Sequence, residues 1–97
     1  MHAIPATAVV DAVVSNALLR VGRSDLATRA ATGADVRGAL QGIILDSEER
    51  GLPADELSAL WGVAHMRYTR PAKAISMAAE LFPNDYAAAI CAALEDA

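Results

Sequence analysis

The side chains of this chain that carry the most binding chemistry fall within one short basic stretch. Its members are His65, Arg67, Tyr68, Arg70 and Lys73. They supply cationic groups and hydrogen-bond donors, and Arg and Tyr are enriched at the binding hot spots of protein interfaces. We therefore predict that these five residues form the partner-binding surface.

Acidic residues gather on both sides of this stretch. Residues 46–66 carry five acids against Arg50 alone, and residues 74–97 carry four acids and no base. The net charge of the chain is −4, which argues against sequence-independent binding to nucleic acid or to an anionic membrane. The first acidic block is the candidate acidic face, made of Asp46, Glu48, Glu49, Asp55 and Glu56.

Residues 55–75 also resemble part of a helix-turn-helix unit. Leu57 falls in the first helix of that pattern, Gly62 in the turn and Val63 directly after it. The second helix would then present the basic residues to phosphates and base edges. Pro71 falls inside that second helix and would break it. A DNA-binding regulator using residues 55–75 is therefore the alternative to a protein-binding module.

The sequence contains no catalytic or metal-binding motif. The two histidines, His2 and His65, have no second His or Cys at ligand spacing. Cys91 is the single cysteine, and the alanines around it predict a buried thiol. We therefore expect no metal, no cofactor and no enzymatic activity. A small enzyme whose site is assembled without a recognisable motif is the third hypothesis.

Composition favours a helical fold. Of the 97 residues, 23 are alanine and 55% are hydrophobic, and alanine is the strongest helix former. This length suits one domain. We predict an all-α fold, a compact bundle of five to six short helices without a sheet, as a single domain over residues 1–97.

Helix boundaries follow from apolar spacing and from helix-breaking residues. The first helix runs from Pro5 to Gly22, and its inward face carries Val10, Val13, Val14, Ala17, Leu18 and Val21. Ser24 caps a second helix that Gly33 ends. The apolar face of the third holds Val36, Leu40, Ile43, Ile44 and Ser47. On this third helix, Gly38 and Gly42 are four residues apart, a spacing that we interpret as close helix packing.

The second half of the chain divides at two prolines. A fourth helix begins near Pro53 and ends before Pro71, with Leu57, Leu60, Trp61, Ala64 and Tyr68 on one face. A fifth begins at about Pro71, and Pro83 ends it. Asn84 caps the last helix, whose predicted inward residues are Tyr86, Ala89, Ile90, Ala93 and Leu94.

Taken together, these patterns favour a non-enzymatic protein-interaction module that regulates or inhibits a partner protein. The partner can be another protein or a second copy of the chain. One version, based on charge alone, is an inhibitor carried by a phage or mobile element, such as an anti-CRISPR, whose acidic blocks occupy a basic nucleic-acid channel. We expect a cytoplasmic location, because a single cysteine fits a reducing compartment. We expect no membrane partner, because the apolar run at 6–19 is too short to span a bilayer.

Overall fold

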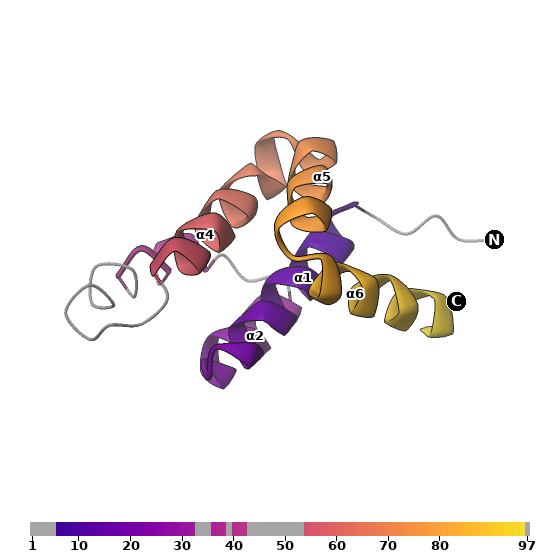
Figure 1. Cartoon of the computed structure of the whole chain (residues 1–97), viewed down its shortest axis with the longest axis horizontal. Coiled ribbons are helices and arrows are strands. Elements are labelled where there is room, and N and C mark those ends of the chain that lie inside the picture. The colour runs from indigo at the N-terminus through magenta and orange to yellow at the C-terminus, as the bar shows by residue number, and fades with distance from the viewer. Residues whose placement is uncertain (1–5, 33–35, 39, 43–53, 97) are drawn as a thin grey trace.

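A computed structural model shows an all-α bundle of short helices, which confirms the predicted fold class (Figure 1). The structure describes residues 6–32, 36–38, 40–42 and 54–96, without the side chains of residues 54, 55, 68 and 96. Its helices are α1 (Ala6–Arg20), α2 (Ser24–Ala31), α4 (Ala54–Thr69), α5 (Pro71–Leu81) and α6 (Pro83–Asp96). Residues 37–38 and 40–42 are also helical, and no strand occurs in the described part of the chain.

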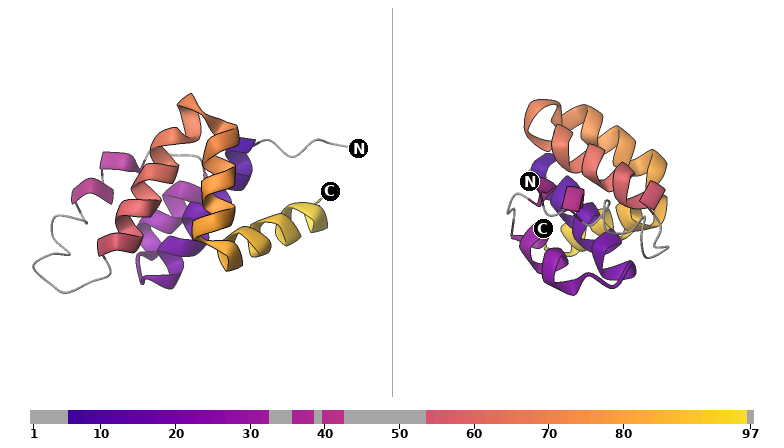
Figure 2. Two further views of the ribbon diagram at one scale, coloured as in Figure 1. Left: turned by 45° about the horizontal axis from the view of Figure 1, so that its top comes forward. Right: turned by 90° about the vertical axis from the view of Figure 1, so that its left-hand side faces the viewer.

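Helix α1 is the centre of the bundle. It contacts α2, α4, α5 and α6, and α2 packs on the side of α1 opposite the antiparallel α4–α5 pair (Figure 2). Its predicted face is buried as expected at Val10, Val13, Val14, Ala17 and Leu18, whereas Val21 is only partly buried. Ser15 is the one buried polar residue described, and its hydroxyl donates to the backbone oxygen of Ala27 in α2 at 2.9 Å. That bond satisfies a buried donor and fixes α2 against α1.

Gly22 ends the first helix, as predicted, and it does so in the left-handed conformation that glycine tolerates best, with φ +83°. The Arg23 N–H donates to the Leu18 oxygen at 2.8 Å, and the Gly22 N–H donates to the Leu19 oxygen at 3.1 Å. This pair of bonds is the Schellman motif. The predicted cap at Ser24 is wrong by one residue: Arg23 is the N-cap of α2, and no side chain caps it.

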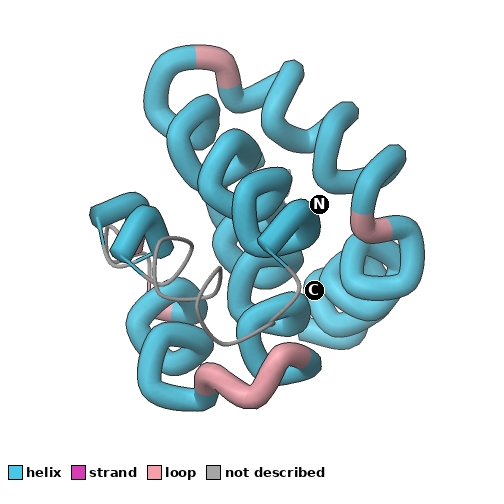
Figure 3. Tube along the Cα trace, turned by 60° about the vertical axis from the view of Figure 1, so that its left-hand side comes forward, coloured by secondary structure: helices cyan, strands magenta, loops and turns pink. Residues whose placement is uncertain are grey.

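Prolines set the two later breaks, as predicted. Arg70 and Phe82 each precede a proline and adopt extended φ values of −143° and −131°, because the proline ring disfavours helical geometry in the residue before it. The N–H of each of these residues still donates the last backbone hydrogen bond of one helix, and its carbonyl oxygen accepts the first backbone hydrogen bond of the next. Both joints are therefore short, as Figure 3 shows. The predicted cap at Asn84 is wrong, because α6 already begins at Pro83.

Helix α4 runs without interruption through Gly62. The predicted turn of a helix-turn-helix unit at this glycine is therefore wrong. Leu57, Leu60 and Val63 are buried on successive turns of α4, and this packing keeps the chain helical across a residue that lowers helix propensity. The chain breaks at Arg70 instead, eight positions later.

Three predictions about packing are corrected. Gly38 and Gly42 are exposed, and a Cβ added to either would meet no described atom within 4 Å, so neither glycine makes a close approach to a described helix. Leu94 is 63% exposed, and Cys91 is exposed rather than buried. Of the third predicted face, Val36 and Leu40 are buried, whereas Ile43, Ile44 and Ser47 lie outside the described residues, as do Pro5, Gly33 and Pro53.

The described helices include none that is both long and apolar enough to cross a lipid bilayer.

Candidate functional site

Of the described members of the predicted basic set, the structure exposes three and largely buries Arg67. His65 is exposed on α4, Arg70 is exposed at the joint between α4 and α5, and Lys73 is exposed in the first turn of α5. The side chain of Tyr68 lies outside the described part of the chain. His65 also lines a surface pocket.

Arg67 has a structural role that its place in the basic stretch does not indicate. Its guanidinium contacts the carboxylate of Asp11 in α1 through two atoms: Nη2 donates to Oδ2 at 2.8 Å, and Nε lies against Oδ1. The two side chains are only 14% and 16% exposed. A charge-assisted, largely buried ion pair of this kind fixes α4 against α1. Arg67 is therefore a helix-packing residue and does not belong to an exposed basic surface.

One member of the candidate acidic face, Glu56, is engaged in an ion pair between helices. Glu56 contacts the guanidinium of Arg20, which also donates to the Asp85 carboxylate at 3.1 Å. Hydrogen bonding to Glu56 first, and then to Asp85, raises the pKa of Arg20 above its ordinary value. The Arg20 side chain thus joins α1 to α4 and α6. The other members lie outside the described residues: Asp46, Glu48, Glu49 and the side chain of Asp55.

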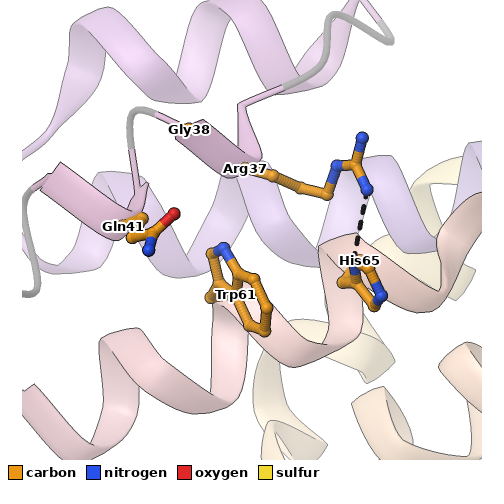
Figure 4. A pocket seen from close by; sticks show the side chains of 5 residues that line it. All are labelled: Arg37, Gly38, Gln41, Trp61 and His65. Atoms are coloured by element: carbon orange, nitrogen blue, oxygen red, sulfur yellow. Dashed lines mark hydrogen bonds between the residues drawn. The ribbon is translucent and has the colours of Figure 1, made fainter.

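A surface pocket opens where the helical residues before α4 face its middle turns (Figure 4). We call it the aromatic–cation pocket, and its described lining residues are Arg37, Gly38, Gln41, Trp61 and His65. Trp61 and His65 are one helical turn apart on α4, and their rings stack with centroids 5.1 Å apart and planes 7° from parallel. The stacked rings line the α4 side of the pocket, and Arg37 and Gln41 lie across from them in the view of Figure 4.

One hydrogen bond joins the two sides of the pocket. The Nη1 atom of Arg37 lies 3.1 Å from Nδ1 of His65. A guanidinium can only donate, so Nδ1 accepts, and the neutral ring carries its proton on Nε2. The bond therefore fixes the tautomer and the orientation of His65, and the stack fixes the plane of the ring.

Trp61 is only half-buried, although it packs against the hydrophobic core. The sequence pattern predicts Trp61 on the inward face of its helix and His65 in the basic set, but it does not predict their contact. Their spacing of four residues on a helix was the signal that could have linked them. Arg37 and Gln41 were missed because they come from another segment of the chain.

The described residues include no cluster of three or more His, Cys, Asp or Glu that could hold a metal ion. Comparisons of the chain with protein families, with curated proteins and with solved structures find no match.

Proposed function

We propose that the chain is a non-enzymatic protein-interaction module whose partner docks on the outer face of α4, over the aromatic–cation pocket. The observation that carries the proposal is the half-exposed Trp61 ring, which is stacked on exposed His65 and faced by Arg37. Trp and Arg are the residues most enriched at interface hot spots. A module of this kind regulates or inhibits its partner by covering the surface that it binds.

The arrangement of these side chains favours binding. The stack and the hydrogen bond hold His65 in one orientation before any partner arrives, so less conformational entropy is lost on docking. Ser58 and Thr69 are exposed on the same face of α4 as His65, and such polar side chains are typical of an interface rim. Exposed Arg70 and Lys73 add positive charge beyond the end of α4, which would steer an acidic partner.

Site-specific photocrosslinking in cells that naturally express the chain tests the proposal. A photoreactive phenylalanine analogue replaces Ser58, on the α4 face, or Thr28, an exposed control position on α2. We expect a discrete protein adduct from position 58 and none from position 28. Trp61→Ala or His65→Ala should remove the adduct while circular dichroism shows the helices intact.

An adduct between two copies of the chain would identify the partner as a second copy and would still support the α4 face. Identical adducts from positions 58 and 28, or an adduct that survives both pocket variants, would contradict the proposal.

A further inference from the structure

We propose that two copies of the chain associate through opposite charges, with the joint between α4 and α5 of one copy against the C-terminal end of α6 of the other. This surface is distinct from the aromatic–cation pocket, and the proposal does not depend on the proposed function. It follows from the exposed charges at two helix ends, from the apolar side chains beside them and from the symmetry of a contact between identical chains.

Two exposed cations mark the joint. Arg70 is the N-cap of α5, and Lys73 lies three residues further on, in the first turn of that helix, a spacing that makes the two side chains neighbours on the helix surface. Within the described part of the chain, neither side chain has an ion pair or a hydrogen bond. The first turn of α5 also holds no acid. Because the positive end of the helix dipole disfavours cations there, this pair of charges does not stabilise α5.

An exposed acid marks the end of α6. Glu95 lies in the last turn of this helix, which holds no basic residue, and its side chain has no partner among the described residues. The negative end of the helix dipole disfavours an anion at this position. The C-terminal half of α6 projects from the bundle (Figure 1). Within one chain, α5 and most of α6 separate Glu95 from the joint, so the two opposite charges are presented at different places on the surface.

Apolar side chains beside the charges supply the rest of the contact. Leu94 directly precedes Glu95 and is 63% exposed, the largest exposed fraction among the large hydrophobic residues described. At the joint, half-buried Pro71 and exposed Ala72 lie between the two cations in the sequence. In the proposed contact, Leu94 packs on these two residues, which removes apolar surface from water, and Glu95 reaches the cations.

Charge complementarity identifies a second copy as the occupant. The chain carries both halves of the contact, and in a protein whose net charge is −4 the basic joint is a surface that attracts the acidic end of another copy. In a dimer with two-fold symmetry each copy contributes one joint and one α6 end, so the contact forms twice and the assembly closes. Few residues take part, and interfaces below about 1,200 Å² of total buried area are typical of weak association. We therefore expect a Kd on the order of 0.1–1 mM.

Sedimentation velocity of the full chain, from about 20 µM to about 1 mM, tests the proposal. A thiol reductant keeps the exposed Cys91 from forming a disulfide between chains. We expect the weight-average sedimentation coefficient to rise with concentration. Raising the salt to about 0.5 M should weaken the association at least about threefold, because salt screens exposed charges.

Two charge-reversal variants locate the contact. The acidic-joint variant carries Arg70→Glu and Lys73→Glu, and the basic-end variant carries Glu95→Arg. Each should raise the Kd at least about tenfold, because like charges then meet across the contact. Both variants place charges where the helix dipole favours them, so circular dichroism should show the helices intact.

A 1:1 mixture of the two variants is the decisive measurement. In a mixed dimer, the acidic joint of one chain meets the basic end of the other, and the unchanged joint meets the unchanged end. The mixture should therefore associate with a Kd within about threefold of the wild-type value. Because the wild-type charge is −4, both variants remain net negative, so overall attraction between them cannot produce this recovery.

Two further variants serve as controls. Glu80→Arg, at an exposed acid near the other end of α5, changes the net charge as Glu95→Arg does and should leave the Kd within about threefold of wild type. Trp61→Ala should also leave the self-association unchanged, so this proposal and the proposed function fail separately. The proposal is overturned if the wild type stays monomeric throughout the concentration range, if either charge-reversal variant associates as tightly as the wild type, or if the mixture does not recover.

Discussion

Replacing Arg67 with Gln should destabilise the fold, because Asp11 then keeps its charge in a largely buried position. Exposed ion pairs contribute about 0–1 kcal/mol, and breaking a buried pair costs about 3–5 kcal/mol. The two side chains are 14% and 16% exposed, which places this pair between those limits. We expect a loss of about 2 kcal/mol in the free energy of unfolding for Arg67→Gln, and the same for Asp11→Asn.

A double-mutant cycle measured by urea denaturation, with circular dichroism as the signal, isolates the interaction. The double variant should lose about 2 kcal/mol rather than about 4 kcal/mol, because neither charge remains to be left unpaired. Lys73→Gln, at an exposed position of α5, is the control and should change stability by less than about 0.5 kcal/mol. If the loss of the double variant equals the sum of the two single losses to within about 0.5 kcal/mol, the structural role of Arg67 is refuted.

Gly62→Ala should stabilise the chain by about 0.5–1 kcal/mol, because Gly62 lies inside α4 with space for a Cβ, and a loss in urea denaturation would argue against a continuous α4. Gly22→Ala should cost about 1 kcal/mol because of its φ of +83°, and an unchanged stability would contradict the left-handed cap. Leu60→Ala should cost about 2–5 kcal/mol, because the side chain is fully buried; a loss below about 1 kcal/mol would contradict its place in the core. The hydrogen bonds from Arg23 hold the pKa of Asp25 below its ordinary value. The stability that this pair contributes is therefore present at neutral pH. It is lost as the pH falls from the unfolded-state pKa of Asp25 through its lower folded-state pKa. In a carboxyl-carbon resonance titration, Arg23→Gln should raise the Asp25 midpoint, and an unchanged midpoint would contradict this pairing.

Local backbone rules explain why the helix ends could be predicted. The effects of Gly22, Pro71 and Pro83 act within a few residues of each position, so the sequence alone locates the breaks that they cause. Gly62 resembles a turn residue by the same local rules. It remains helical because Leu60 and Val63 beside it are buried, and burial is decided by the whole bundle.

The orientation of α6 was harder to predict. Residues 86–94 carry no charged side chain, so nothing in their pattern distinguishes an inward from an outward face. The structure buries Ala89 and leaves Cys91 and Leu94 exposed. Which small apolar side chains face α1 follows from how α6 leaves the joint at Phe82, a property of the three-dimensional arrangement.

The candidate site was only partly predictable for a related reason. Trp61 and His65 are joined by helical spacing, which a sequence displays directly. Arg37 reaches His65 across 28 positions, and Asp11 reaches Arg67 across 56. Contacts at such separations depend on the packing of the helices, so the basic stretch looked like one surface although Arg67 belongs to the interior.

The affinity of the crosslinked partner for the wild-type chain and for two alanine variants, measured by titration calorimetry, tests the interaction proposal most directly. Trp61→Ala should weaken binding by about 30-fold or more, the loss expected at a hot spot. Thr28→Ala, on α2, should change the Kd by less than about threefold. Equal affinities for the wild type and the Trp61 variant, with both chains folded, would contradict a partner-binding role for the aromatic–cation pocket.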